Sequence, residues 1–542
     1  MFRMMQSKEN DPSGDSSQDS LSWRHVYHDK LQTCVLRGVQ NLQKQGVSEI
    51  FVDPFGDPEA TAEVAHLAAF SFDELKIPKS RINQPPISCF TAHLDNDPDG
   101  LLDAWNRGRI LAKAQNQARR WMEMPANLFP PEVFAHKIEE SLSDALKSSA
   151  GKATLTLEVH DKAWIEQQSM GGVLGVAKGS ARLPYFVEIN FMGDPSRPND
   201  HIALVGKGVT FDAGGISIKP SAGMGDMRAD MGGAAVIASV VMGLLELQTP
   251  INIRAYLPLV ENMPDGNAIR PGDVIRMANG TTVQVDNTDA EGRLILADAL
   301  HYAQTRNPLF LLDAATLTGA ISISLGDRYT GLFCNRGAQR RPVSDIWPPA
   351  AEMSNKSSAS STTHTSTVNT PTILGALSCS GRVKNDPFWH MPTLYHKQLK
   401  ESASCADIAN VTSGAFARLG GSGSASAFLQ ALPIELAASS YRPFNDGIGV
   451  LSASVFEMAN IINRTTDMPK LERLVVPPLA FSFVNPRIPF VHLDIAGVMK
   501  TVGDDLGMRR GMTGRPTRSL IHFFDHLARY GCIKGNDEEE DA

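Results

Sequence analysis

Short apolar runs recur through the middle of the chain, and segments with a helical spacing of apolar residues lie between them. Runs of this kind are typical of strands that are buried on both faces. The predicted strands are TLTLEVH, YFVEINF, HIALVG, INIRAYLPLV and LFLLDAATL, and the predicted helices are GGAAVIASVVMGLLEL and GRLILADALHYAQ. Strands that alternate with helices predict an α/β domain with a mostly parallel central sheet.

The chain before Ala153 has a different pattern. EIFVDPF and TAEVAHLAAFSF indicate the strand and helix of a small α/β unit, and the segment from Leu101 to Glu123 has a strong helical spacing. Pro125 ends that helix, and Pro131 stands in the first turn of the next one. We therefore expect two domains: a small N-terminal α/β domain at residues 23–103, linking helices at 104–152 and a larger C-terminal α/β domain at 153–533.

Polar stretches interrupt this plan at four places. Residues 1–22 and 534–542 have few apolar positions, which predicts a disordered tail and an acidic tail. Insertions are expected at about 336–375 and 432–486. Within the first, Ser354–Thr372 is so rich in Ser and Thr that we expect an exposed loop that is dispensable for chemistry. The competing hypothesis for that segment is a phosphorylation-tuned lid.

Composition and charge narrow the class of protein. The chain has 542 residues, of which 42% are hydrophobic and 20% are charged, and its formal net charge is -8. These values favour a soluble protein of two domains and disfavour binding to nucleic acid or to a membrane. No apolar run approaches the roughly 20 residues of a spanning helix, and the N-terminus lacks the apolar core of a secretory signal. We expect a cytoplasmic protein whose six cysteines are buried free thiols.

Two acidic residues stand where predicted strands end or helices begin. Asp212 follows the strand HIALVG, together with Lys207, and Asp230 precedes a Gly-rich helix start. Ligands of α/β sheets bind at the C-terminal ends of the strands, so this is a suitable place for a site. A phosphate-binding loop is disfavoured because no helix starts directly after Lys207. A turn with a surface Lys and Asp is the simpler alternative for this segment taken alone.

A second acidic group lies in the segment VDNTDAEGRL. Asp289 and Glu291 are two residues apart, and Arg293 is two residues further. On an extended segment these three side chains share one face, which predicts that two carboxylates and a guanidinium point into the same space. The alternative is that the acids only decorate the N-terminus of the following helix, where the helix dipole favours negative charge.

The four carboxylates together predict a metal site. Clustered without a cation, they would repel one another and become protonated. Two divalent ions would cancel the four charges, and carboxylates are good bridging ligands for such a pair. There is no HExxH motif and no histidine between His201 and His301, so the site must be rich in oxygen. Lys207 is a candidate nitrogen ligand if nearby metal lowers its pKa enough to make it a neutral amine.

Seven segments together resemble the leucyl aminopeptidase family (cytosol aminopeptidase, peptidase family M17). They are VGKGVTFDAGGISIKP, MRADMGGAA, ENMPDGNAIRPGD, NTDAEGRLILADAL, ATLTGA, HLDIAGVM and GMTGRPTR. The segment NTDAEGRL is the most specific of these. The resemblance covers residues 104–430 and 488–525, which is most of the chain.

The resemblance implies a role for each candidate residue. One metal would be held by Asp212, Asp289 and Glu291, and the other by Lys207, Asp212, Asp230 and Glu291. Lys219 matches the catalytic lysine of the family, and Arg293 matches the arginine that positions a bicarbonate ion. The residues that match the substrate-binding positions are Met227, Asn287, Thr316, Leu317, Gly319, Ala496 and Met499.

The implied function is that of a metal-dependent aminopeptidase, a hydrolase that removes an N-terminal residue, with a Leu-type preference, from peptides with a free N-terminus. Two metal ions would activate the attacking water, and the chain would assemble into a homohexamer. Zn, Mn, Mg and Co all suit a carboxylate-rich site, so the sequence leaves the identity of the ions open. A dipeptidase such as a Cys-Gly hydrolase would use the same site, and a catalytically silent scaffold or chaperone is the alternative from another class.

Overall fold

The computed structural model describes residues 16–54, 56–91, 98–149, 151, 153–347, 371–390, 405–411, 483–503 and 508–531. The described residues form two compact units. The first consists of those up to Lys113 together with those in Val502–Arg510, and the second consists of those in Ala114–Thr501 and from Gly511 onward. The boundary lies after Lys113, inside helix α4 (Pro98–Glu123), nearly three helical turns beyond the expected end of the N-terminal domain at residue 103.

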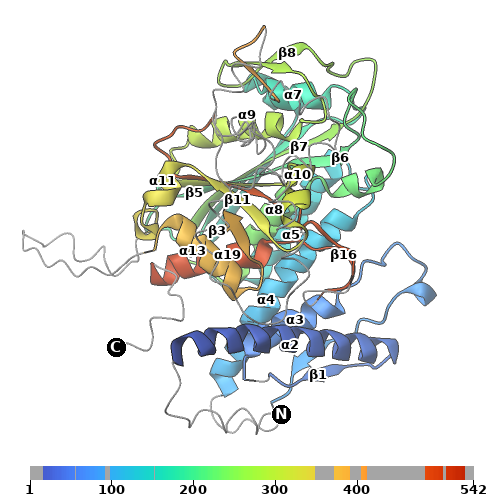
Figure 1. The fold of residues 1–542 in the computed structure, drawn as a ribbon, viewed down its shortest axis with the longest axis vertical. Coiled ribbons are helices and arrows are strands. Elements are labelled where there is room, and N and C mark those ends of the chain that lie inside the picture. The colour runs from blue at the N-terminus through green and yellow to red at the C-terminus, as the bar shows by residue number, and fades with distance from the viewer. Residues whose placement is uncertain are drawn as a thin grey trace, which may run out of the picture. The chain divides into compact units, whose positions relative to one another are not determined.

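The first unit is built on two helices and a short parallel strand pair. Helices α2 (Ser16–Lys44) and α3 (Pro58–Ala69) pack together (Figure 1). β1 (Ile50–Val52) pairs in parallel with β2 (Ile87–Cys89). The strand and helix predicted in this region are therefore present. A short 3-10 helix, η1, spans Pro78–Ser80.

The predicted tail at residues 1–22 is wrong from Ser16 onward, because α2 begins there. Leu31, Val35 and Val39 recur at helical spacing and are buried in the core of this unit. Once such a helix is nucleated, each further residue adds one hydrogen bond for the entropy of fixing one residue. The polar residues that precede the apolar positions can therefore continue the helix toward Ser16. Residues 1–15 and the acidic tail at 534–542 lie outside the described residues.

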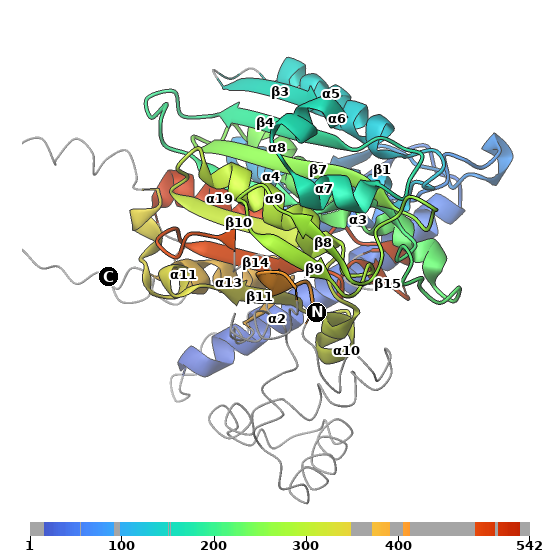
Figure 2. The same cartoon turned by 90° about the horizontal axis from the view of Figure 1, so that it is seen from above.

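The second unit is organised around a nine-stranded sheet with the order β12-β11-β14-β10-β5-β7-β4-β3, in which β6 also pairs with β7 (Figure 2). The neighbouring pairs β14–β10, β10–β5 and β5–β7 are parallel, and β4 and β3 join antiparallel at one side. The mostly parallel sheet is thus confirmed. The strands are β3 (Thr154–His160), β4 (Tyr185–Met192), β5 (Ile202–Gly206), β6 (Gly208–Asp212), β7 (Asn252–Asn262), β10 (Phe310–Ala315), β11 (Thr330–Cys334), β12 (Phe388–His390) and β14 (Phe490–Asp494).

Helices pack on this sheet through alternate residues of its strands. Ala203 and Val205 of β5 belong to a core shared with α7 (Gly171–Ala177) and α9 (Gly292–Gln304). Helix α8 (Gly232–Glu246) contacts β5, β7 and β10, and its own contacts include α5 (Pro131–Ser148) and α19 (Thr517–Tyr530). The other helices of this unit are α6 (Lys162–Gln167), η2 (Met224–Ala229), α10 (Gly319–Leu325), α11 (Arg336–Arg340), η3 (Val343–Asp345) and α13 (Ile373–Val383).

Two smaller sheets lie beside the main one. β8 (Asp273–Arg276), β9 (Thr282–Val285) and β13 (Ile408–Ala409) form a three-stranded sheet in the order β13-β9-β8. β15 (Lys500–Thr501) pairs antiparallel with β16 (Gly511–Met512). β15 begins directly after Met499. The predicted pocket residues Ala496 and Met499 therefore lie in the connection between β14 and β15.

The described ends of the two expected insertions are ordered. Helix α11 and the buried Ile346 and Trp347 belong to the first, and the buried Phe483 and Val484 belong to the second. Thr372 caps α13 through its hydroxyl, so the Ser/Thr-rich segment ends in a helix cap. The expected exposed loop up to residue 370 and the rest of the second insertion lie outside the described residues.

Two expectations from composition need correction. The five described cysteines are free, as expected. Cys34 and Cys405 are exposed, and among the five only Cys334 is buried, so the prediction of buried thiols was wrong for most of them. In addition, Met224–Glu246 is long and apolar enough to cross a membrane, with a mean hydropathy of 1.5. The most apolar stretch of this segment is 94% buried inside the fold. The segment is therefore apolar because its helix lies in the core, between the main sheet and other helices.

Candidate active site

The candidate residues lie on connections that follow strands of the main sheet or precede its helices. Lys207 joins β5 to β6, Asp212 ends β6, and Asp230 lies between η2 and α8. Asp289 and Glu291 lie in the connection from β9 to α9. Because β5, β6, β7, β10 and β14 run in parallel, the connections after β5 and β6 lie at one edge of the sheet. The connection from β9 to α9 meets them there, since Glu291 contacts Lys207 and Asp289 contacts Lys219.

The first group of charges surrounds Lys207. Its Nζ atom lies 2.8 Å from Asp230 Oδ1 and 2.9 Å from Glu291 Oε1, and it donates to the carbonyl of Thr316 at 3.0 Å. A side chain on Gly292 would meet the Cε atom of Lys207 at 2.5 Å, so the glycine leaves the space that the lysine occupies. The Thr316 hydroxyl also donates to Asp230 Oδ1 at 2.8 Å.

The second group of charges surrounds Lys219. Its Nζ atom lies 2.7 Å from Asp212 Oδ2 and 2.5 Å from Asp289 Oδ1. The other oxygen of Asp212 accepts hydrogen bonds from the Asn262 amide at 2.8 Å and from the Gly214 N–H at 2.9 Å. Gly214 has a φ of +89°, a conformation that favours glycine, and this turn brings the chain round to Lys219.

Burial is the largest cause of the raised pKa of three of the four carboxyl groups, whereas for Glu291 burial is outweighed by the nearby Lys207 and Lys219, which lower the pKa. Burial, and then the nearby Glu291, raise the pKa of Asp212 to about 6. Burial also raises the pKa of Asp230 and of Asp289. For Lys207, burial alone would lower the pKa, but the Asp230 and Glu291 carboxylates outweigh burial and raise it. The site is therefore strongly anionic and needs positive charge to keep its carboxylates ionised.

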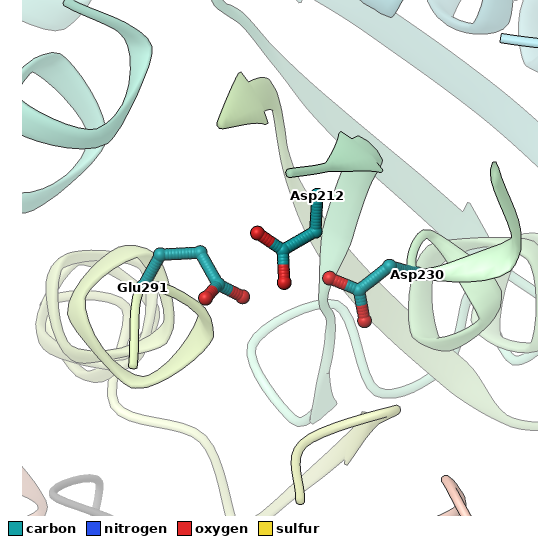
Figure 3. A group of neighbouring side chains, drawn as sticks. All are labelled: Asp212, Asp230 and Glu291. Carbon is teal, nitrogen blue, oxygen red and sulfur yellow. The ribbon is translucent and has the colours of Figure 1, made fainter. Parts of the chain in front are cut away.

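The donor set fits a divalent metal ion. One carboxylate oxygen from each of Asp212, Asp230 and Glu291 can be chosen so that all three lie within 4.8 Å of one another, and all three residues are buried (Figure 3). Asp230 Oδ2 and Glu291 Oε2 are buried and have no hydrogen-bond partner among the described residues. Buried carboxylate oxygens without partners are costly unless a ligand satisfies them, and hard divalent cations prefer such oxygens.

A cavity of about 490 Å³ opens onto these carboxylates. Its lining includes all five predicted metal ligands and Lys219. Of the predicted substrate-binding residues, all except Asn287 line it as well. The further lining residues include Met224, Asp226, Thr318 and Ser322. The structure thus brings together in one cavity nearly all the residues that were predicted from segments far apart in the sequence.

The predicted shared face of Asp289, Glu291 and Arg293 is wrong in part. Glu291 has the backbone conformation of a helix (φ -78°, ψ -37°), and α9 starts at Gly292. Arg293 is therefore in a helical turn and does not line the cavity, and its Nη1 atom donates to the Asn410 carbonyl at 3.0 Å. Asn287 is not among the residues that line the cavity, and its side chain accepts a hydrogen bond from the Asp289 N–H at 2.9 Å.

Two residues next to the site were not predicted. Asp494, at the end of β14, accepts hydrogen bonds from the Leu317 and Ala496 N–H groups, each at 3.2 Å, and from the Thr318 hydroxyl at 2.6 Å. Asn410 binds the turn before Asp289. The position of Asp494 after a strand was a usable signal, because the other acids were found in that way. Nothing in the local sequence of Asn410 points to the site.

Comparison with known proteins identifies the family. Residues 116–352 match the model of the cytosol aminopeptidase family, catalytic domain. The chain is 38% identical to the cytosol aminopeptidase of Sus scrofa over 93% of its own length and 77% of the relative's length. It is also 38% identical to that of Homo sapiens, over 92% and 76%. Among solved structures, the bottromycin maturation enzyme BotP in complex with Mn is 26% identical, with a TM-score of 0.64, over 93% of this chain and 88% of that one.

These matches extend over both units and include the segments that form the cavity. A relative of this identity, covered over more than two thirds of its length, has the same catalytic domain. The buried acidic triad of the candidate active site lies within the residues that match the family model. The chain therefore belongs to the cytosol aminopeptidase family of metal-dependent peptidases.

Proposed function

We propose that this protein is a two-metal aminopeptidase that removes an apolar first residue, of the Leu type, from peptides with a free N-terminus. The observation that carries the proposal is the convergence of four carboxylates and two lysines on one cavity.

The donor set divides naturally into two groups. Asp212, Asp289 and Glu291 would hold one ion, and Lys207, Asp230 and the shared Asp212 and Glu291 would hold the other. Two bound divalent ions would lower the pKa of a water molecule so that hydroxide is available at neutral pH, and would polarise the scissile carbonyl. Manganese is one candidate ion, since BotP was solved with it.

Lys219 is the cation best placed to act on the substrate. It lines the cavity and 20% of its side chain is exposed, whereas 2% of the Lys207 side chain is exposed. Burial would lower the pKa of Lys219, but Asp212 and its neighbours raise it, so the side chain is an ammonium. It would stabilise the negative charge that develops on the carbonyl oxygen in the transition state.

Arg293 would act from behind the carboxylates. Its Nε atom is buried and has no hydrogen-bond partner among the described residues, while Nη1 is fixed by Asn410. An anion such as bicarbonate would satisfy that buried donor, and it would then act as the general base beside the attacking water. Burial lowers the pKa of Arg293, and the Glu291 carboxylate offsets part of that shift.

The rest of the cavity supports a preference for an apolar side chain. Met227, Ala496 and Met499 give it an adaptable apolar wall, and Gly319 leaves space beside them. We also propose, on the family resemblance, that the protein is a cytoplasmic homohexamer. Sedimentation velocity of the purified protein tests the assembly.

The test of the function combines metal analysis with kinetics. Purified protein should contain two divalent ions per chain and should hydrolyse Leu-amide. Chelation should abolish the activity, and Mn or Zn should restore it. Acetyl-Leu-amide should not be cleaved, because a capped amine cannot bind a metal ion. Full activity in metal-free protein, or cleavage of the acetylated substrate, would contradict the proposal, and activity restricted to dipeptides would favour the Cys-Gly type of hydrolase.

A further inference from the structure

The segment around Asn410 reaches the candidate active site from far along the chain. β13 pairs in parallel with β9, and Asn410 follows β13 directly and is fully buried. The Asn410 N–H donates to the Gln284 carbonyl at 2.9 Å, which continues the strand pairing by one residue. Asn410 therefore lies where β9 passes into the turn that carries Asp289.

The side chain of Asn410 binds the backbone of that turn. Its Oδ1 atom accepts hydrogen bonds from the N–H groups of Asp286 at 2.9 Å and Asn287 at 3.3 Å, and its Nδ2 atom donates to the Asn287 carbonyl at 2.7 Å. The Asn287 side chain in turn accepts from the Asp289 N–H. An amide side chain supplies both the acceptor and the donor that this arrangement needs, whereas a carboxylate supplies only the acceptor.

The backbone of Asn410 binds a second part of the candidate active site, the Arg293 side chain. Its carbonyl accepts the hydrogen bond from Arg293 Nη1 at 3.0 Å. Arg293 lies in the first turn of α9, two residues after Glu291. One residue thus binds both the turn before Glu291 and the guanidinium after it.

We propose that Asn410 is a positioning residue of the active site. It fixes the turn at residues 286–289 and the Arg293 side chain relative to each other, and so places Asp289 and the guanidinium on either side of Glu291. The proposal rests on the proposed function, because the roles of Asp289 and Arg293 are part of it. Replacing a residue that orients metal ligands typically costs about 10–100-fold in metal affinity or activity.

A matched control lies at the other end of the same strand pair. Asp407 Oδ2 accepts hydrogen bonds from the Thr282 N–H and from the Thr282 hydroxyl, both at 2.7 Å. Asp407 is exposed and makes these bonds where β9 begins, away from the turn. Asp407→Ala therefore loosens the attachment of β13 and leaves the bonds of Asn410 in place.

The experiment compares Asn410→Ala, Asn410→Asp and Asp407→Ala in the full chain, with Leu-amide as the substrate. We expect Asn410→Ala to lower kcat/KM by roughly 10–100-fold. Asn410→Asp keeps the acceptor but places an oxygen against the Asn287 carbonyl in a buried position, so its kcat/KM should fall at least as far as that of Asn410→Ala. Asp407→Ala should stay close to wild type. The inference is overturned if Asn410→Ala and Asp407→Ala lower kcat/KM equally.

A double-mutant cycle with Arg293→Ala separates positioning from a loss of folding. If Asn410 acts through Arg293, then Arg293→Ala should cost less in the Asn410→Asp background than in wild type. Independent costs would overturn the inference, even if one variant folds poorly. An inactive wild-type enzyme would instead refute the proposed function, so the two failures can be told apart.

Discussion

The two lysines of the site have different surroundings, and their substitution should have different effects. Lys207 is enclosed by two carboxylates and a carbonyl, whereas Lys219 is open to the cavity. Lys219→Ala should therefore keep the metal ions and lower kcat by roughly 10²–10³-fold, as expected for the loss of one donor to the transition state. Lys207→Ala should weaken metal binding.

Metal content by mass spectrometry and kcat on Leu-amide, measured on the same samples, check both variants. Lys162→Ala, at an exposed lysine of α6, is the control. If Lys219→Ala lost its metal and Lys207→Ala kept it, the two roles would be reversed.

The two acids before α9 should also differ in effect. Glu291 is buried and belongs to the triad of close carboxylates, whereas Asp289 is at the edge of the group with 31% of its side chain exposed. Glu291→Ala should lose both ions and lower activity by roughly 10²-fold or more, because each ion contributes several kcal/mol of charge stabilisation. Asp289→Ala should lose one ion. Normal metal content with a normal rate in either variant would refute the ligand assignment.

At the scale of elements, Asp494 connects the two loops that line the cavity. One loop follows β10 and contains Leu317 and Thr318, and the other follows β14 and contains Ala496. Asp494→Ala would leave two backbone N–H groups without their acceptor, which costs about 1–3 kcal/mol for each buried group. We expect a lower melting temperature and a raised KM for Leu-amide.

Asp494→Asn serves as the conservative comparison. It keeps an oxygen that can accept from both N–H groups, so its KM should stay nearer to wild type. Thr318→Val removes the third hydrogen bond together with the cap that the Thr318 hydroxyl gives to α10 by accepting from the Ile321 N–H, so its effect combines both losses. Equal KM values in all three variants would show that the loops do not depend on Asp494.

The sequence predicts the elements well where one physical signal dominates. Helix α9 was predicted at its observed bounds, because GRLILADALHYAQ has a clear helical period next to a polar turn. The four carboxylates could be predicted from charge and from their places beside strands and helices. The substrate pocket came from the family resemblance, since apolar residues in a pocket wall and in a core have the same pattern.

Other features depend on contacts that no local pattern carries. The orientation of Arg293 follows from a helix that begins one residue after Glu291, and such boundaries are uncertain in any sequence pattern. The contribution of Asn410 depends on pairing between β13 and β9, which are far apart in the chain. Short strands of two to four residues carry little signal of their own.

At the scale of the whole molecule, each unit contains a histidine that is neutral in the folded state. Burial, and then Arg109, lower the pKa of His66 in the first unit to about 4. Burial, and then Arg254, lower the pKa of His201 in the second unit to about 4. An unfolded chain binds protons at these positions from about pH 6.5 downward. Both groups therefore stabilise the fold above that pH, and this contribution is lost as the pH falls toward 4.

Urea unfolding at pH 7 and at pH 5 checks this expectation. Buried carboxyl groups with raised pKa values, such as Asp212 and Asp298, act in the opposite direction, so the test compares the variant with wild type. Relative to wild type, His201→Phe should make the change in midpoint from pH 7 to pH 5 more favourable to the folded state, because the variant has no group to protonate there. The exposed His136 is the control, and its replacement by Ala should leave the difference unchanged. The same change in midpoint in His201→Phe and in wild type would contradict the prediction.

The place of β14 in the main sheet has a consequence for how the protein is made. β14 lies between β10 and β11, and all five of its residues are buried. At ribosomal speeds of about 5–20 residues per second, it emerges roughly 10–30 s after β11. Until then, β10 and β11 have unpaired edges in a nascent chain, which invites aggregation or chaperone binding. A fragment that ends at residue 347 should thus be insoluble although it spans nearly all of the matched catalytic domain, and co-expression of residues 483–542 should restore some soluble protein.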